Sequence, residues 1–166
     1  MRHGFVKVAA VTPDIKVADC RYNMESIKRE MDKCRKEAVK IAVFPELCIT
    51  GYTCGDLFLQ DILLEDAKEA LKALVEYSKG FDMICFVGLP VMKNARLYNV
   101  CAVFCGGKLL GMVPKRNIPN YSEFYERRHF EEGSKEVSEI KLEGYDAPVL
   151  FGGNILFECT NVVGLT

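Results

Sequence analysis

Apolar strand-like runs alternate with helical segments through the first half of the chain, and this alternation restricts the possible folds most strongly. Strand-like runs occupy residues 5–11, 41–44 and 83–88, and helical periodicity covers about 20–39 and 61–79. A strand–helix–strand–helix–strand order is typical of parallel strands joined by crossover helices. The sequence therefore predicts an α/β layered sandwich.

The second half of the chain adds strands of a different kind. Runs at 97–105 and 108–113 are separated only by Gly106-Gly107, which predicts a tight hairpin. A long polar and aromatic segment follows at 115–134. Four short strand-like runs come after it, at 136–142, 149–151, 154–159 and 162–166. Antiparallel strands added to a parallel set predict a mixed sheet.

Length and charge exclude several classes of protein. A chain of 166 residues fits one domain. Its 22 basic and 23 acidic residues are well mixed, which argues against a nucleic-acid or membrane-surface partner. No apolar run approaches the ~20 residues that span a bilayer, and no signal-peptide core precedes the first strand. We therefore expect a cytoplasmic protein.

The eight cysteines do not suggest a disulfide scaffold or a zinc site. Most lie inside apolar runs, where cysteine behaves as a small buried hydrophobe. No Cys-x-x-Cys pair occurs and only two histidines are present, so the ligand spacings of structural zinc are missing. No metal site is expected.

Glu46 follows the buried run 41–44 directly, after Pro45 has ended the strand. In open α/β sheets the carboxyl ends of strands are where sites lie, and a charged residue in such apolar surroundings needs a partner or a chemical role. The alternative is an ordinary turn or capping carboxylate. Lys115 follows the strand at 108–113 and can lie at the same rim of the sheet. Its alternative is a solvated surface charge.

Two segments carry a family resemblance. Phe44-Pro-Glu-Leu-Cys-Ile-Thr-Gly-Tyr52 and Pro114-Lys-Arg-Asn-Ile-Pro-Asn-Tyr-Ser-Glu-Phe-Tyr-Glu126 resemble the motifs of the nitrilase or carbon–nitrogen hydrolase superfamily. Cys54-Gly-Asp-Leu-Phe58 and Arg127-Arg-His-Phe130 are similar to the glutaminase domain of glutamine-dependent NAD+ synthetases. The resemblance implies a nitrilase-like αββα sandwich with mixed sheets. Residues 1–166 would be its N-terminal portion, incomplete at the C-terminus and without the synthetase domain.

The resemblance also implies a chemistry and a set of residues. The family hydrolyses a carboxamide with a Glu–Lys–Cys triad, through a thioester. By resemblance Glu46 is the general base and acid and is expected to be buried, Lys115 stabilises the oxyanion, and Glu123 orients the triad. Tyr52, Tyr121 and Phe124 match positions near the glutamine pocket or the ammonia exit. For these aromatic residues simple packing is an equal alternative.

The catalytic cysteine is expected after the run that ends at Thr166, and none of the eight cysteines matches its context. Cys48 and Cys54 flank the Glu46 loop, but the nucleophile must face the base from a separate element. Cys159 lies inside the preceding strand-like run. The 166 residues alone are therefore expected to be inactive.

Three functions remain open. The first is glutamine amide hydrolysis that supplies ammonia for ATP-dependent NAD+ synthesis from deamido-NAD+. The second is an amidase or carbamoylase acting on another small amide, and the third is a non-catalytic binding module. The expected ligand is L-glutamine or another small amide. No cofactor is expected in this domain, because ATP and magnesium would belong to the synthetase domain, and the resemblance implies a homo-oligomer when complete.

Overall fold

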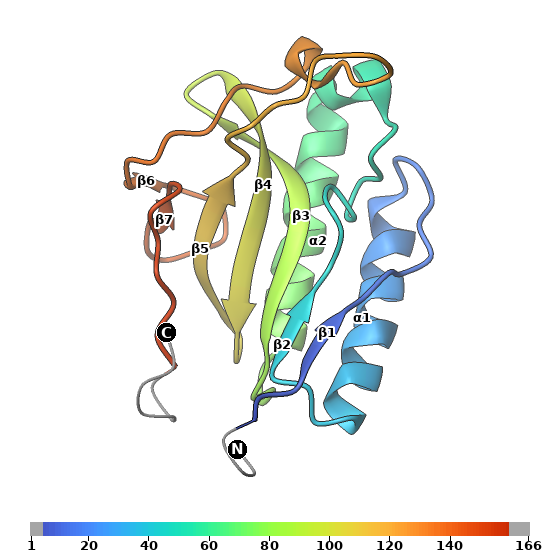
Figure 1. The fold of residues 1–166 in the computed structure, drawn as a ribbon, viewed down its shortest axis with the longest axis vertical. Coiled ribbons are helices and arrows are strands. Elements are labelled where there is room, and N and C mark those ends of the chain that lie inside the picture. Colours follow the sequence, from blue (N-terminus) through green and yellow to red (C-terminus); the bar gives the residue numbers. More distant parts are fainter. Residues whose placement is uncertain (1–4, 160–166) are drawn as a thin grey trace.

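A computed structural model describes residues 5–159, in which one mixed sheet of seven strands forms the centre of the fold (Figure 1). The strand order across the sheet is β1-β2-β3-β4-β5-β7-β6. The strands are β1 (Val8–Ala10), β2 (Ile41–Val43), β3 (Ile84–Lys93), β4 (Arg96–Cys105), β5 (Lys108–Pro114), β6 (Ser138–Ile140) and β7 (Val149–Phe151).

The pairing confirms the mixed sheet that the sequence predicts. β1, β2 and β3 run parallel, with Ala42 of β2 in register with Cys85 of β3. β4 pairs antiparallel with both β3 and β5, so 84–114 form a three-stranded meander. β7 then joins β5 in parallel and pairs antiparallel with β6. The parallel pairs β1–β2 and β2–β3 come from the alternating first part of the chain, because parallel strands need a long crossover connection, which is usually an α-helix.

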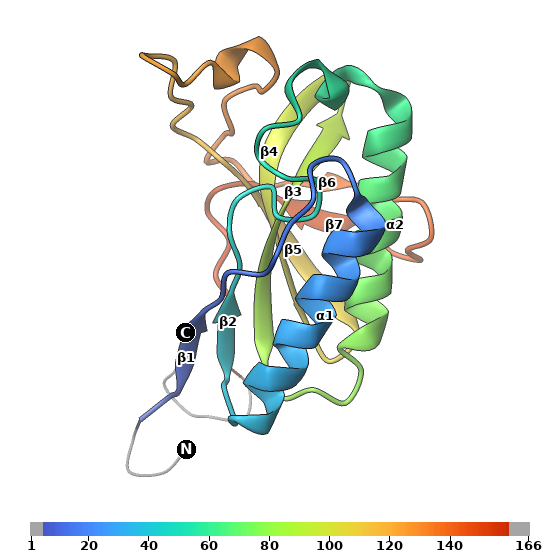
Figure 2. The ribbon, with the colours of Figure 1, turned by 90° about the vertical axis from the view of Figure 1, so that its right-hand side faces the viewer.

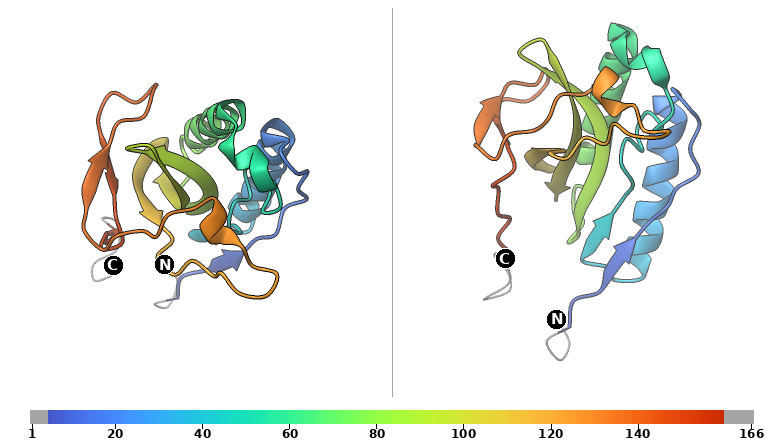
Figure 3. Two further views of the ribbon diagram at one scale, coloured as in Figure 1. Left: turned by 90° about the horizontal axis from the view of Figure 1, so that it is seen from above. Right: turned by 45° about the horizontal axis from the view of Figure 1, so that its top comes forward.

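Both crossover helices, α1 (Cys20–Lys36) and α2 (Asp61–Tyr77), cover the same face of the sheet (Figures 2 and 3). α1 begins after Asp19, whose side chain accepts a hydrogen bond from the Tyr22 N–H at 2.9 Å. Alternate side chains of β3 from Cys85 to Val91 point toward the helices and are fully buried. The core of this layer includes Ile27, Met31, Leu71, Leu74, Cys85, Val87 and Leu89.

The opposite face of the sheet carries the alternate side chains and is more open. Val43 is 46% exposed there, and Phe86, its partner in register, is half-buried. The chain after β7 returns across this face. The Phe157 ring meets the Phe86 ring edge-on, and both Ile155 and Phe157 lie close to Gly111.

Two predicted strands differ from the observed structure. The run expected to end near Gly88 continues to Lys93, passing through Pro90. β2 pairs with β3 only as far as Phe86, so the later part of β3 has a partner on one side only, a position that tolerates proline. Residues 154–159 have no strand conformation, and the run at 162–166 lies outside the described residues.

Among residues 5–159, neither helix has the length and apolar character needed to cross a membrane.

Candidate active site

The loop after β2 brings Glu46 over the sheet because Gly88 of β3 leaves room for it. A Cβ at Gly88 would lie 2.4 Å from the Leu47 nitrogen and 2.6 Å from the Pro45 carbonyl oxygen. The Gly88 carbonyl accepts the Ile49 N–H at 3.2 Å. Leu47 adopts a φ of +51°, a left-handed conformation that is costly for a leucine. The loop is therefore packed directly on the sheet.

α1 and the chain before it fix the rest of this loop. The buried Asn23 side chain donates to the Ile49 carbonyl at 2.9 Å, and the Ala18 N–H donates to the Thr50 carbonyl at 2.7 Å. The Gly51 N–H closes the turn on the Leu47 carbonyl, also at 2.7 Å. These bonds satisfy the backbone groups of a segment that has no sheet partner. Glu46 consequently stands on a rigid turn.

Lys115 lies at the end of β5 and meets two carboxylates. Its Nζ is 2.9 Å from Glu46 Oε2, and 3.0 Å and 3.1 Å from the two carboxylate oxygens of Glu126. Burial lowers the pKa of Lys115, but hydrogen bonds and Coulombic attraction from Glu46 and Glu126 outweigh it. The pKa is raised above its ordinary value, so the amine stays cationic.

Glu126 is the buried member of this group, with 6% of its surface exposed. It precedes Arg127 at the start of a short 3-10 turn, η2 (Glu126–Arg128). Besides Lys115, it accepts a hydrogen bond from the Tyr52 hydroxyl at 2.5 Å. Burial, together with the Glu126 hydrogen bond and the charges of Glu126 and Glu46, raises the pKa of Tyr52, so this phenol remains a donor. The buried charge of Glu126 is therefore fully paired.

The structure separates the two glutamates that the motif contains. Glu123, which the resemblance places beside the triad, is exposed, and within residues 5–159 it makes no ion pair or hydrogen bond. Glu126 contacts Lys115 instead. Both acids stand in one motif, and no spacing rule in the sequence distinguishes them. Glu46 is also less buried than expected, since half of its side-chain surface is exposed.

An ion-pair clamp joins the two loops that carry these residues. Arg128 donates two hydrogen bonds of 2.8 Å to Asp56, which lies in the 3-10 turn η1 (Gly55–Leu59), and His129 Nε2 lies 3.1 Å from the same carboxylate. The Phe58 ring packs edge-on against Phe130 below the clamp. Hydrogen bonds from Arg128 and His129 lower the pKa of Asp56 to about 2. In Figure 1 the orange segment that contains η2 crosses the upper end of the sheet to reach η1.

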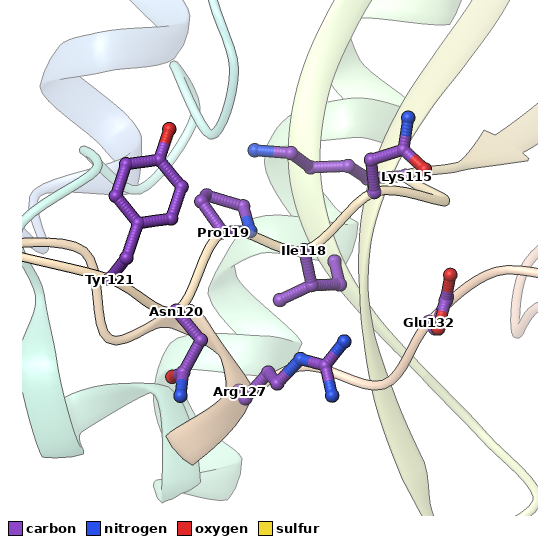
Figure 4. Close-up of a pocket in the computed structure, with 8 residues that line it drawn as sticks. Lys115, Ile118, Pro119, Asn120, Tyr121, Arg127 and Glu132 are labelled. Atoms are coloured by element: carbon purple, nitrogen blue, oxygen red, sulfur yellow. The ribbon is translucent and has the colours of Figure 1, made fainter.

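A hollow of about 460 Å³ opens beside Lys115 (Figure 4). Its lining consists of Lys115, Asn117, Ile118, Pro119, Asn120, Tyr121, Arg127 and Glu132. Tyr121 is 67% exposed and packs edge-on against Phe124, with ring centroids 5.7 Å apart. Tyr52 is not among the lining residues and contacts Glu126 instead. Tyr121 thus borders the hollow, whereas Phe124 supports the Tyr121 ring.

Of the three cysteines near the site, Cys48 and Cys54 are buried and Cys101 is half-buried. Burial raises the pKa of Cys48 to about 12, and its Sγ is 3.7 Å from the Gly88 carbonyl oxygen. Burial also raises the pKa of Cys101, to about 11, and that of Cys54. Nucleophilic cysteines act as thiolates, so these three lack the required ionisation near neutral pH. In the described part of the chain no group of three His, Cys, Asp or Glu side chains could hold a metal ion.

Sequence comparison gives a consistent set of relatives. The glutamine-dependent NAD(+) synthetase of Mycobacterium tuberculosis is 39% identical over 163 residues, which cover 98% of this chain and 24% of the relative. The enzyme of the same name from Aquifex aeolicus is 36% identical over 129 residues, 78% of this chain and 22% of the relative. The chain thus spans about a quarter of the length of these curated relatives.

Structure comparison agrees. A glutamine-dependent NAD(+) synthetase from Cytophaga hutchinsonii superimposes with a TM-score of 0.86 at 25% identity, over 94% of this chain and 26% of the other. An amidase from Nesterenkonia shares the fold, with a TM-score of 0.66 at 15% identity over 86% of this chain and 53% of the other. The two helices on a mixed sheet are therefore the N-terminal portion of a nitrilase-like fold. The family profile described as "Carbon-nitrogen hydrolase" matches residues 7–158, and the chain belongs to this family.

Proposed function

We propose that this chain forms part of a glutaminase, in which Glu46 and Lys115 hydrolyse the side-chain amide of glutamine and the ammonia serves ATP-dependent NAD+ synthesis from deamido-NAD+. The observation that carries the proposal is the contact of Lys115 Nζ with both Glu46 and Glu126, at 2.9 Å and 3.0 Å. The similarity to glutamine-dependent NAD(+) synthetases over 98% of the chain supports the choice of glutamine.

The geometry suits the chemistry that the family implies. A carboxylate on a rigid turn can take the proton of a thiol and later return it to the departing ammonia. A lysine kept cationic by two carboxylates can stabilise the negative oxygen of the tetrahedral intermediate. We assign the orienting role to Glu126 rather than to Glu123, since Glu126 is the glutamate that contacts Lys115 and Tyr52.

The nucleophile in this proposal is a cysteine outside residues 5–159. Cys48, Cys54 and Cys101 have pKa values raised by burial, and Cys48 faces the backbone of Gly88. We also propose that the aromatic side chains of Tyr52 and Tyr121 border the amide substrate, because Tyr52 contacts Glu126 and Tyr121 lines the hollow beside Lys115.

The test compares residues 1–166 with the protein as encoded, including any residues that follow. Ammonia and glutamate release would be measured with glutamine, asparagine and a carbamoyl amino acid. Residues 1–166 should be inactive, and the encoded protein should prefer glutamine. Lys115→Met should lower kcat by roughly 10²–10³, whereas Lys7→Met, which removes an exposed ion pair with Glu37, should not. Preference for another amide would favour the amidase alternative, and the lack of any hydrolysis would favour a binding module.

A further inference from the structure

The two carboxylate oxygens of Glu46 have different surroundings. Oε2 accepts hydrogen bonds from Lys115 Nζ at 2.9 Å and from the side-chain amide of Asn99 at 3.2 Å. Oε1 receives no hydrogen bond from any residue between 5 and 159. Half of the Glu46 side-chain surface is exposed, so an unbonded oxygen is accessible. The carboxylate is thus held by one oxygen and open at the other.

Asn99 lies where the sheet itself fixes its position. It belongs to β4, is 2% exposed, and stands in register with Pro90 of β3. Its backbone carbonyl accepts the Lys115 N–H at 2.7 Å, so Asn99 and Lys115 are cross-strand neighbours. Side chains directly opposite each other lie on the same face of a sheet, which brings both donors to Glu46 Oε2.

The direction of the Asn99 hydrogen bond follows from the chemistry of its partner. An ionised carboxylate only accepts hydrogen bonds, so the amide must present its NH2 group to Glu46. Hydrogen bonds to a charged group are stronger than those between neutral groups. The amide therefore restrains the rotation of the Glu46 carboxylate. An apolar residue at this buried position would not.

We propose that Asn99 is a positioning residue that directs Glu46 Oε1, and not Oε2, toward the reacting thiol. This inference rests on the proposed function. The thiol proton moves to Oε1 as the sulfur–carbon bond forms. The same proton then passes to the amide nitrogen as the carbon–nitrogen bond breaks and ammonia leaves, which returns Glu46 to its ionised state. Throughout, Lys115 and Asn99 keep Oε2 in place.

The test substitutes only the Asn99 side chain, because the backbone bond to Lys115 survives any substitution. Asn99→Leu has a similar size without the donor, and Asn99→Asp replaces the donor with a second carboxylate. In the encoded protein, kcat for glutamine should fall about 10- to 100-fold in Asn99→Leu, with little change in KM. The loss of kcat should be larger in Asn99→Asp, because the new carboxylate would repel that of Glu46.

Within residues 5–159, three charged or titratable groups surround Glu46. Lys115 faces Glu46 from the end of β5, and Tyr52 faces it from the loop that also carries Glu46. Glu126 in η2 acts on Glu46 through Lys115. None of these residues is substituted in the Asn99 variants, so a change in kcat reports the lost amide. Ser78→Ala is the matched control, since the buried Ser78 hydroxyl accepts a hydrogen bond from the Gly107 N–H at the far end of the sheet. It should leave kcat unchanged.

A second readout does not depend on activity. A crystal structure of Asn99→Leu should show the Glu46 carboxylate rotated away from the position that it has in the unsubstituted protein. If Asn99→Leu does not fold, Asn99→Ser should show the same rotation. An unchanged position of the Glu46 carboxylate together with an unchanged kcat would overturn the role of Asn99. Absence of glutaminase activity in the unsubstituted protein, with a rotated carboxylate in the variant, would instead overturn the proposed function alone.

Discussion

The Nζ of Lys115 lies 3.0 Å from Glu126, the last acid of its motif, and not against Glu123, three residues earlier in the chain. Glu126 is buried and pairs with both Lys115 and Tyr52, whereas Glu123 is exposed. Tyr52 comes from the loop after β2, and Lys115 from the end of β5. One buried carboxylate therefore connects the two halves of the candidate site.

This pairing predicts that Glu126→Gln will lower glutaminase activity far more than Glu123→Gln. Loss of the charge at Glu126 leaves Lys115 bound to Glu46 alone and removes the strongest acceptor of the Tyr52 hydroxyl. Misplacement of a catalytic group by about 1 Å can cost roughly a hundredfold in rate, and we expect a loss of that size. Steady-state kinetics with glutamine measures it.

Glu123→Gln is the control for this experiment, because the two substitutions are chemically identical and lie three positions apart in the same segment. Its kcat and KM should match those of the unsubstituted protein within about twofold, as for surface substitutions away from a site. Equal losses in the two variants would contradict the role given to Glu126. Circular dichroism would confirm that both variants fold.

Gly88→Ala should move the Glu46 loop. The added Cβ would lie 2.4 Å from the Leu47 nitrogen, and this contact is with backbone, which cannot turn aside. Overpacking of this kind costs about 1–3 kcal/mol of stability. Urea denaturation should show this loss, and glutamine hydrolysis should fall with it because Glu46 is displaced from Lys115.

Gly111→Ala provides the matched comparison on the same face of the sheet. Its Cβ would meet only the side chains of Phe157 and Ile155, at 3.3 Å and 3.4 Å, which can shift slightly. We expect a smaller change in stability and no specific loss of kcat. A Gly88→Ala variant as stable and as active as Gly111→Ala would show that the loop does not depend on this close approach.

The lowered pKa of Asp56 predicts that the stability of the fold depends on pH. Hydrogen bonds from Arg128 and His129 lower the pKa of Asp56 from the ordinary 3.8 to about 2. A carboxylate whose pKa is lower in the folded state stabilises the fold above its unfolded pKa, and this contribution disappears as the pH falls through the folded value. The difference in urea midpoint between the unsubstituted protein and Asp56→Asn should therefore be present at neutral pH and shrink between about pH 4 and 2.

Asp14→Asn is the control for the Asp56 experiment. Asp14 is exposed and makes no ion pair within residues 5–159. Its substitution should leave the urea midpoint nearly unchanged across the same pH range. A constant difference for Asp56→Asn down to pH 2 would mean that the Arg128 clamp contributes through packing instead of charge.

The sequence predicted the layered fold well, because periodicity reports which face of an element is buried. Predicted and observed helices agree at their first residues, Cys20 and Asp61, and the Gly106-Gly107 hairpin joins β4 to β5 as expected. The predicted end of β3, before Pro90, was wrong. Local sequence does not show that β2 stops short and leaves the later part of β3 with one partner. Edge positions are a property of the assembled sheet.

The same limit applies to the site. Sequence alone placed Glu46 and Lys115 after strands and left open whether they meet, because 69 residues separate them. Only the sheet order brings their side chains to 2.9 Å. Asn99 carried no signal in the sequence, since its role depends on standing opposite Lys115 in the β4–β5 pairing.

The chain by itself thus determined its elements, its family resemblance and the residue types available for amide chemistry. Tertiary structure decided which of those residues share hydrogen bonds: Glu126 in place of Glu123, and one oxygen of Glu46 in place of both. The physical reason is the separation along the chain of the residues that interact. Helix and strand patterns arise from neighbours a few residues apart, whereas a network of charges forms between strand ends that only the folded sheet brings together.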